Sequence, residues 1–487
     1  MKEVIELKKL NEVYYLVDSF SGGVLEELRD YFRFRPPGYK YMPPYRNGFW
    51  DGYINIFDPN TRLFYVGLKD YMIIFAKEHN YDVEFIGDDP TEEISDEEIS
   101  KFLDNEKLYL EPRYYQIEAL EMALRQKRIT MICPTGSGKS YIMYMIMRWY
   151  RLRTLIIVPT TTLVHQLYSD FEDYGFNSEK YVHKLLGGAD KNSDKPVVIS
   201  TWQSAYKLDK SWFSKFDVVM GDECHLFKAK SLTGIMTKLV DCKYRIGLSG
   251  SLDGSTCNQL ILEGLFGKLF KIVTTKKLMD DKILASLKIK LIVMGYKEEE
   301  RKSRDKNEYQ DEIKYLISHP RRNNYIKNLT LSLKGNTLVL FQFVDDHGQI
   351  LYDMINSSVK ENRKCFFIHG KVSGEERNDI RAVVEEENDA IIVASYGTFS
   401  TGINIKNLNN IIFASPSKSR IRNIQSIGRS LRMTETKVSA NIYDIADDLS
   451  YDKGKKPWYN YGLRHMQERL KIYNSEEFNV KIYGVDI

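Results

Sequence analysis

Cys133-Pro134-Thr135-Gly136-Ser137-Gly138-Lys139-Ser140 is the stretch of sequence around which the fold is organised. The apolar, β-branched run Ile129–Ile132 before it predicts a buried strand, and Tyr141–Tyr150 after it predicts a helix. A strand, a glycine-rich turn and a helix are the context of a phosphate-binding loop, because the turn directs backbone N–H groups at phosphate oxygens beside the positive end of the helix. The stretch therefore predicts an α/β fold with a nucleotide-phosphate site.

Two side chains of this loop have distinct expected roles. Lys139 is expected to reach the β- and γ-phosphates, and the Ser140 hydroxyl to complete the coordination of Mg²⁺. The pattern G-x-x-x-x-G-K-[ST] has glycine where this chain has Cys133, so the loop taken alone leaves a chance glycine-rich turn as the alternative. The expected nucleotide ligands from the loop are Thr135, Gly136, Ser137, Gly138, Lys139 and Ser140.

The composition sets limits on the class of protein. A chain of 487 residues predicts two or three domains. With 70 Lys and Arg against 67 Asp and Glu the net charge is only +3, so any nucleic-acid contact must come from local patches. Five cysteines without C-x-x-C spacing predict reduced thiols and no zinc site. The charged N-terminus and the lack of a long apolar run predict a soluble, intracellular chain.

Short β-branched runs that alternate with helical segments predict parallel, doubly wound sheets in two tandem domains. We expect an N-terminal α/β domain over 1–88, an acidic linker and helix over 89–108, a first domain over 109–285, and a second over 286–487 that contains a charged helical insert at 297–323. The expected strands form two sets of five: 129–132, 154–158, 197–200, 217–220 and 244–248, then 338–341, 365–368, 390–394, 410–414 and 441–445.

The N-terminal domain contains an unusual stretch, 32–52, in which prolines, cations and aromatic residues alternate. Arg46 and Trp50 in this stretch are candidates for gripping a nucleic-acid backbone and stacking on bases. An equally good interpretation is that the rings form the core of the domain and that the cations are ordinary surface residues.

A second set of charged residues follows the strand Asp217–Met220. Asp222 and Glu223 at a strand end suit ATP hydrolysis, in which Asp222 holds Mg²⁺ through water and Glu223 orients or deprotonates the attacking water. His225 beside them is a candidate for relaying the nucleotide state. A solvated acidic loop is the alternative, and the order of these residues after Lys139 counts against it.

With Asp222-Glu223-Cys224-His225 after the phosphate loop, the chain resembles the superfamily 2 helicases. The resemblance implies two RecA-like domains, ATP and Mg²⁺ as cofactors, and adenine recognition by Arg113 and Gln116. It implies a coupling role for Ser249 and Ser251, beside that of His225. The implied contacts to the nucleic-acid backbone from the first domain are Pro159, Thr160, Thr201, Trp202 and Gln203.

The second domain continues the resemblance. Further implied backbone contacts are His369, Gly370, Ser395 and Thr398. Gly402 and Asn404 are implied nucleotide ligands, although many relatives have Asp where this chain has Asn404. Gln425-Ser426-Ile427-Gly428-Arg429-Ser430-Leu431-Arg432 matches Q-x-x-G-R-x-x-R, which implies that Gln425 positions the γ-phosphate and that Arg429 and Arg432 act as arginine fingers.

Several motifs, among them Thr201-Trp202-Gln203 and Arg46-Asn47-Gly48-Phe49-Trp50-Asp51-Gly52, are similar to UvsW helicases of T4-like phages. This implies ATP-driven remodelling of branched DNA: Holliday-junction migration, fork regression and R-loop unwinding in phage recombination, repair and replication. The implied partners are branched or forked DNA, RNA–DNA hybrids, and recombination or single-strand-binding proteins, in the host cytoplasm. An RNA helicase and a nucleotide-gated clamp that does not translocate are the alternatives.

Overall fold

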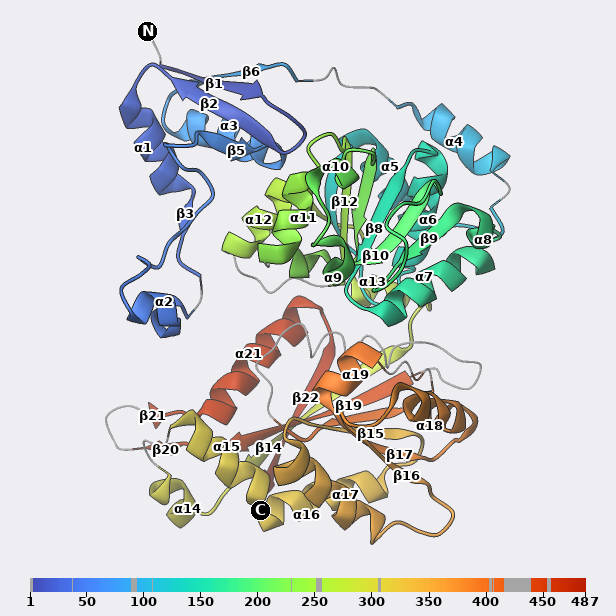
Figure 1. Ribbon diagram of the computed structural model, residues 1–487. Coiled ribbons are helices and arrows are strands. Elements are labelled where there is room, and N and C mark those ends of the chain that lie inside the picture. Colours follow the sequence, from blue (N-terminus) through green and yellow to red (C-terminus); the bar gives the residue numbers. More distant parts are fainter. Residues whose placement is uncertain are drawn as a thin grey trace. The chain divides into compact units, whose positions relative to one another are not determined.

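The computed structural model describes residues 3–36, 38–88, 94–106, 108–228, 230–250, 256–304, 308–402, 405, 407–415, 439–452 and 457–487. The chain forms two compact units: residues 1–133 with 138–273, and residues 134–137 with 274–487 (Figure 1). Among the helices within these ranges, none is long and apolar enough to cross a membrane.

The N-terminal part of the first unit is a four-stranded sheet in the order β5-β2-β1-β6. Strand β1 pairs antiparallel with β2 and parallel with β6. Alternate residues of the strands face α1 and α3, and together they bury an apolar core that includes Leu7, Val17, Leu28 and Phe75. The elements are β1 (Val4–Lys9), β2 (Tyr14–Ser19), α1 (Gly22–Tyr31), β3 (Arg33–Phe34), η1 (Tyr39–Tyr41), α2 (Pro43–Arg46), β4 (Ile54–Asn55), β5 (Leu63–Tyr65), η2 (Val66–Leu68), α3 (Lys69–Glu78) and β6 (Asp82–Ile86).

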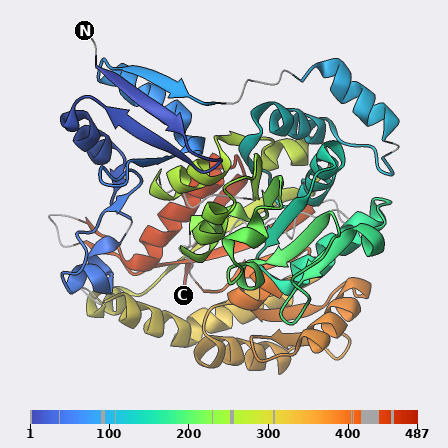
Figure 2. The ribbon, with the colours of Figure 1, turned by 45° about the horizontal axis from the view of Figure 1, so that its top comes forward.

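A short helix, α4 (Asp96–Asn105), follows this sheet in the chain (Figure 2). It begins at the expected capping box, in which Ser95 accepts from the Glu98 amide and the Glu98 carboxylate accepts from the Ser95 amide at 2.9 Å. Phe102 of this helix packs edge-on against Trp149, with ring centroids 5.1 Å apart. The helix that ends the acidic segment is also held by ion pairs of Asp96 with Arg125 and of its C-cap residue Glu106 with Arg148 and Arg151.

The larger part of the first unit is a sheet of seven parallel strands in the order β13-β7-β12-β11-β8-β10-β9. Helices α9 to α12 cover one face over an apolar cluster that includes Leu155, Val219 and Phe266, while α6 contacts both α5 and α7 on the other side (Figure 1). The elements are α5 (Tyr114–Gln126), β7 (Arg128–Ile132), α6 (Lys139–Tyr150), β8 (Thr154–Val158), α7 (Thr161–Asp173), α8 (Ser178–Tyr181), β9 (Val182–Leu185), β10 (Val197–Thr201), α9 (Trp202–Ala205), α10 (Lys210–Phe213), β11 (Val218–Gly221), η3 (Cys224–Lys228), α11 (Lys230–Lys238), β12 (Tyr244–Ser249), α12 (Thr256–Phe266) and β13 (Leu269–Lys271).

The two sheets of the first unit are joined by a packed interface at α12. Leu260 of α12 belongs to the apolar core of the N-terminal sheet. Gly67 lies so close to α12 that a Cβ there would collide with the Glu263 carbonyl, and a Cβ on Gly264 would lie 2.9 Å from the Tyr65 ring. Arg128 also forms an ion pair with Glu12. The N-terminal domain is therefore built onto the first parallel sheet.

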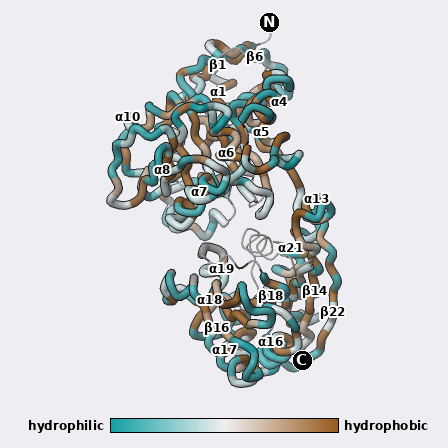
Figure 3. Tube along the Cα trace, turned by 90° about the vertical axis from the view of Figure 1, so that its right-hand side faces the viewer, coloured by the Kyte–Doolittle hydropathy of each residue, from teal (hydrophilic) through white to brown (hydrophobic). Residues whose placement is uncertain are grey.

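The second unit contains another sheet of seven parallel strands, in the order β16-β17-β15-β18-β19-β14-β22. Hydrophobic residues concentrate on the strands, as Figure 3 shows for β16 and β18. The elements are α13 (Thr275–Asp280), β14 (Ser286–Gly295), α14 (Glu298–Ser303), α15 (Tyr309–Ser318), α16 (Pro320–Ser332), β15 (Thr337–Phe341), η4 (Val344–Gly348), α17 (Gln349–Asn356), β16 (Cys365–Ile368), α18 (Gly374–Glu386), β17 (Ile391–Ser395), α19 (Tyr396–Gly402), β18 (Asn410–Phe413), β19 (Ser439–Asp448), β20 (Tyr451–Asp452), β21 (Pro457–Trp458), α21 (Tyr461–Ser475) and β22 (Asn479–Asp486).

The expected α/β class with two doubly wound parallel sheets and a small N-terminal α/β domain is confirmed. Each expected strand is present, with ends that shift by at most three residues. Each parallel sheet has two strands more than expected, β9 and β13 in the first and β14 and β22 in the second. The described residues of the charged stretch 297–323 lie largely in α14, α15 and the start of α16, which follow β14 inside the second unit.

Candidate functional site

The loop between β7 and α6 has the geometry of a phosphate site. Gly136 and Gly138 take φ values of 88° and 81°, which side chains disfavour. Gly138 is the N-cap of α6, makes no side-chain capping bond, and is followed by a first turn without acidic residues. The first N–H groups of α6 therefore keep their capacity to bind an anion. At the base of the loop, the Cys133 amide donates to the Ser249 carbonyl at 2.8 Å.

The acidic residues after β11 lie beside Lys139, as expected. Glu223 has a φ of 48°, a left-handed conformation that is uncommon outside glycine and typical of functional sites. His225 Nδ1 lies 2.8 Å from Ser249 Oγ and 3.3 Å from Glu223 Oε2. The two motifs at the ends of β11 and β12 are thus joined through one imidazole, and the coupling roles of His225 and Ser249 stay predictions.

Electrostatics separate the two carboxylates. Burial and the charge of Glu223 raise the pKa of Asp222 to about 6. Burial opposes ionisation of Glu223 as well, but Lys139 and His225 lower its pKa to about 2. Burial disfavours the charged form of Lys139, but the negative charges of Glu223 and Asp222 outweigh the effect of burial, so the pKa of Lys139 is raised. Glu223 is therefore a permanent carboxylate, and Asp222 is sensitive to the charges that surround it.

The oxygen donors of this site suit a hard divalent cation. The Ser140 hydroxyl and the Asp222 carboxylate are ligands of the kind that Mg²⁺ takes, with water and phosphate oxygens filling the remaining positions. Within the described ranges, no cluster of three or more His, Cys, Asp or Glu residues could hold a metal by itself. A site with few protein ligands fits an ion that arrives with a nucleotide.

Gln116 and Arg113 lie at the start of α5. Gln116 is buried, and its Oε1 accepts from the Arg113 amide at 2.9 Å. Its Nε2 is so close to Gly138 that any side chain there would collide with it. Arg113 Nη1 donates to the Tyr115 hydroxyl at 3.0 Å. The structure therefore brings the expected adenine-binding residues to the edge of the phosphate loop.

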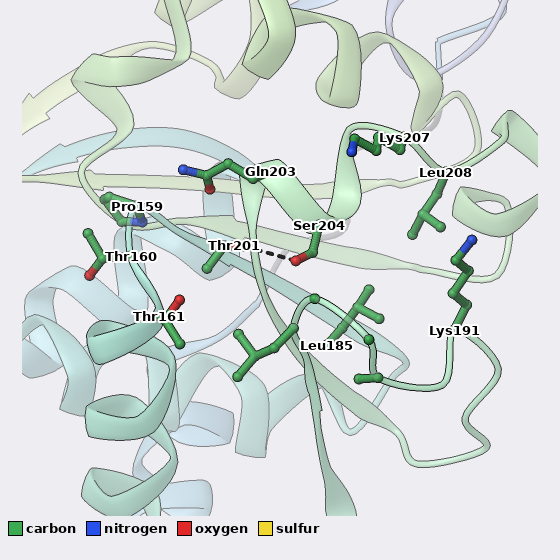
Figure 4. A pocket seen from close by; sticks show the side chains of 14 residues that line it. Pro159, Thr160, Thr161, Leu185, Lys191, Thr201, Gln203, Ser204, Lys207 and Leu208 are labelled. Carbon is green, nitrogen blue, oxygen red and sulfur yellow. Dashed lines mark hydrogen bonds between the residues drawn. The ribbon is translucent and has the colours of Figure 1, made fainter.

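A cavity of about 880 Å³ opens at the carboxyl ends of β8 and β10 (Figure 4). It brings together the expected residues Pro159, Thr160, Thr201 and Gln203. Trp202 instead packs against the apolar cluster under α9 to α12. Lining residues that the motifs did not indicate are Gly187, Gly188, Lys191, Ser204 and Lys207, and the Ser204 hydroxyl bonds to Thr201 at 3.1 Å. We name this cavity the first-lobe pocket.

A second cavity, of about 600 Å³, lies at the carboxyl ends of the strands in the second unit. Gly370, Ser395 and Thr398 line it, and the two hydroxyls bond to each other at 2.8 Å. His369 is not among the lining residues and its ring packs against Phe367. Arg377, which the sequence did not indicate, lines this cavity and donates to the Gly370 carbonyl at 3.1 Å.

In the aromatic stretch of the N-terminal domain, some rings stabilise the stretch and others face solvent. Trp50 is half-buried and its Nε1 donates to the Tyr53 carbonyl at 2.6 Å. Arg35 lies over the Tyr53 ring at 4.3 Å. Arg46 is exposed, and Phe49 is 86% exposed. The stretch therefore contains both packed rings and an exposed ring, Phe49, and its contact with nucleic acid stays a prediction.

Several expected residues lie outside the described residues: Ser251, Asn404, Gln425, Arg429 and Arg432. Gly402 is described and is the last residue of α19, which follows β17. The roles of Gly402 and of the five residues outside the described ranges stay predictions.

Comparison with known proteins agrees with this arrangement. Three family models match: "DNA helicase UvsW, N-terminal" over 9–86, "Type III restriction enzyme, res subunit" over 109–253, and "Helicase conserved C-terminal domain" over 321–434. The ATP-dependent DNA helicase uvsW of Enterobacteria phage T4 is 37% identical over 95% of both chains. The DNA 3'-5' translocase XPB2 of Sulfurisphaera tokodaii is 29% identical over 40% of this chain and 43% of its own.

Solved structures give the same result. The crystal structure of T4 UvsW aligns over the whole of both chains at 34% identity, with a TM-score of 0.52. A fragment of a putative type I restriction HsdR subunit from Vibrio vulnificus covers 81% of this chain and 72% of its own at 18% identity, with a TM-score of 0.58, and shows the fold alone. Fold, site and comparisons define a superfamily 2 helicase. The chain belongs to the UvsW family of ATP-dependent DNA helicases.

Proposed function

We propose that this protein is a motor that remodels branched DNA by hydrolysing ATP: it migrates Holliday junctions, regresses forks and unwinds R-loops in phage recombination, repair and replication. The proposal of branched substrates is supported by the similarity to the T4 helicase along the whole chain, the N-terminal domain included. The cluster of Lys139, Glu223 and His225 beside an uncapped helix carries the proposal of ATP hydrolysis.

In this proposal the phosphates bind the backbone from Thr135 to Ser140, and Lys139 neutralises charge on the β- and γ-phosphates. Mg²⁺ would be held by Ser140 and, through water, by Asp222; when bound it polarises the phosphoryl oxygens. Glu223 positions the attacking water. Gln425, Arg429 and Arg432 are proposed to act on the γ-phosphate, and Gly402 and Asn404 to contact the nucleotide.

Each of the two cavities is proposed to hold a nucleic-acid backbone. Each has hydroxyl and backbone groups at the carboxyl ends of parallel strands, where ligands of open α/β sheets bind. Hydroxyls and N–H groups bind phosphates without reading sequence, which a motor requires. The chain is proposed to have the domain limits 1–88, 89–108, 109–285 and 286–487, and to act in the host cytoplasm with recombination or single-strand-binding proteins as partners.

Substrate preference is the first test. ATPase and unwinding should be measured in parallel on a four-way junction, a fork, an RNA–DNA loop, plain duplex DNA and single-stranded RNA. The proposal expects the strongest stimulation by the branched DNAs. Greater stimulation by single-stranded RNA would favour an RNA helicase instead.

The second test separates a motor from a nucleotide-gated clamp. Glu223→Gln keeps the shape of the side chain and removes its charge, so ATP should bind while unwinding stops. A variant that binds ATP normally and still remodels junctions at the parental rate would show that hydrolysis is not required, as the clamp predicts.

The role of the aromatic stretch can be tested by a point substitution. Deleting the N-terminal domain is avoided because it would expose the α12 surface on which that domain packs. Phe49→Ala should weaken junction binding by about 1–3 kcal/mol, the usual value of one base–aromatic stack, and leave the DNA-free ATPase unchanged. Phe20→Ala is the matched control, because Phe20 is 93% exposed in the same domain but lies outside the stretch. Equal binding by the two variants would remove the stacking role from Phe49.

A further inference from the structure

The Ser140 hydroxyl has a partner that none of the helicase motifs includes. Ser140 Oγ lies 2.8 Å from the hydroxyl of Tyr174, within hydrogen-bond distance. Tyr174 is the C-cap residue of α7, and 34 residues of chain separate it from Ser140. The contact therefore joins the start of α6 to the end of α7 at the proposed metal ligand.

The position of Tyr174 is set by its surroundings on both its backbone and its ring. The Tyr144 hydroxyl donates to the Tyr174 carbonyl at 3.3 Å, and Arg148 Nη1 donates to the Tyr144 hydroxyl at 2.8 Å. The Tyr174 ring packs edge-on against Tyr141, with centroids 4.9 Å apart, and at 5.4 Å from Tyr144. A ring held in this way presents its hydroxyl at one place, which is what a positioning group requires.

The chemistry of a serine metal ligand explains what such a partner does. A serine oxygen that binds a cation offers a lone pair to the ion, so its hydrogen must point elsewhere and needs an acceptor. The phenol oxygen of Tyr174 is such an acceptor. Burial raises the pKa of Tyr174 to about 12, so the ring carries a neutral hydroxyl at physiological pH.

We propose that Tyr174 is a positioning residue for Ser140: it accepts the serine hydrogen and turns the serine lone pair toward the magnesium ion of a bound nucleotide. The inference rests on the proposed role of Ser140 as a Mg²⁺ ligand. It also gives α7 two functional ends, because the N-cap of this helix is Thr160, which lines the first-lobe pocket. The same helix thus connects a proposed nucleic-acid contact with the metal ligand of the ATP site.

Binding of the non-hydrolysable analogue AMP-PNP to the full-length protein, measured by calorimetry with Mg²⁺ and with EDTA, tests the inference without catalysis. The ratio of the two affinities is the gain from magnesium. Tyr174→Phe should lower this gain about 5-fold, the equivalent of one hydrogen bond, and leave affinity in EDTA unchanged. Tyr168→Phe removes a phenol hydroxyl from the same helix α7, where Lys184 rather than Ser140 lies against the ring, and should keep the parental gain. Thermal unfolding verifies that both variants fold.

Ser140→Ala separates the inference from the proposed function. If Ser140→Ala loses the gain and Tyr174→Phe adds no further loss in that background, the inference is supported. A parental gain in Tyr174→Phe, equal losses in Tyr174→Phe and Tyr168→Phe, or equal losses with and without Mg²⁺ would overturn it while Ser140 keeps its role. A parental gain in Ser140→Ala would overturn both. If Tyr174→Phe does not fold, Tyr174→Leu replaces it, and the same gain in AMP-PNP affinity from Mg²⁺ is measured and judged in the same way.

Discussion

Two helix N-termini of this molecule show opposite solutions to the same electrostatic problem. The first N–H groups of any helix lack partners within the helix and carry partial positive charge. At the start of α21, the Glu312 carboxylate accepts from the amides of Tyr461 and Gly462 at 2.9 and 2.6 Å. At the start of α6, Gly138 provides no side-chain cap.

The difference between these two helix N-termini indicates which of them binds a ligand. Glu312 is only 2% exposed, and its Oε1 also accepts from Asn460 Nδ2 at 2.9 Å, so the anion that α21 needs is part of the protein. The helix α6 begins with Lys139 and has no acid in its first turn, so the anion must come from outside. A helix N-terminus whose N–H groups are already bound by a carboxylate of the chain has a structural role. A helix N-terminus that follows a glycine-rich turn and has no such carboxylate can bind an anionic ligand.

The largest expected effect comes from removing the cation at the open helix end. Lys139→Ala should lower ATP turnover by about 10³-fold, the scale of a lost electrostatic contact to transition-state charge, because nothing else at the α6 terminus replaces the ammonium group. DNA binding and the melting temperature should stay near the parental values. Steady-state ATPase, DNA binding and thermal unfolding measure the three quantities, and a collapsed melting transition would contradict a phosphate-binding role for Lys139.

The closed helix end should respond in the opposite way. Glu312→Ala leaves buried N–H groups of α21 without an acceptor and should lower the free energy of unfolding by about 3 kcal/mol. Turnover per folded molecule should not change. Urea unfolding and ATPase at a temperature where the variant is folded measure both, and Glu312→Gln, which keeps one acceptor oxygen, is the control with the smaller loss. A turnover defect equal to that of Lys139→Ala would remove the distinction between the two helix ends.

The pH dependence sharpens the comparison, because Asp222 beside the open end is held with its pKa raised to about 6 from an ordinary 3.8. Protonation should weaken magnesium binding about tenfold per pH unit below that value, so ATP turnover falls on acidification. The free energy of unfolding of the nucleotide-free protein should instead rise on acidification. Between pH 6 and pH 4, Asp222 holds a proton in the folded state that it releases in the unfolded chain, so its contribution to stability increases as the pH falls toward 4.

Asp222→Asn should remove the stability trend between pH 4 and 6, which chemical unfolding of both proteins across this range would measure. A parental trend in Asp222→Asn would assign the titration to another group.

How far the sequence predicts this molecule depends on the distance between the residues involved. The loop around Lys139 and the turn at Asp222 are local patterns, and the structure places the loop between β7 and α6 and the turn directly after β11, as their sequence context indicates. Strand β22 was missed because most of its residues are exposed and it lacks the apolar character of a buried strand. The Glu312 cap and the Tyr174 contact join residues 150 and 34 positions apart, and pattern analysis does not report such distances. Composition does not show which ring of the aromatic stretch faces inward, so the half-burial of Trp50 and the exposure of Phe49 are seen only in the structure.

The shared core at α12 limits how this protein can be rebuilt. Leu260 of α12 is a core residue of the N-terminal sheet, and Gly67 fits only because it lies directly against the α12 backbone. The N-terminal domain therefore cannot be exchanged between relatives as an independent unit. A chimera that exchanges this domain between relatives has to carry the matching α12 with it. Junctions cut in the acidic linker alone would pair mismatched surfaces and yield insoluble hybrids.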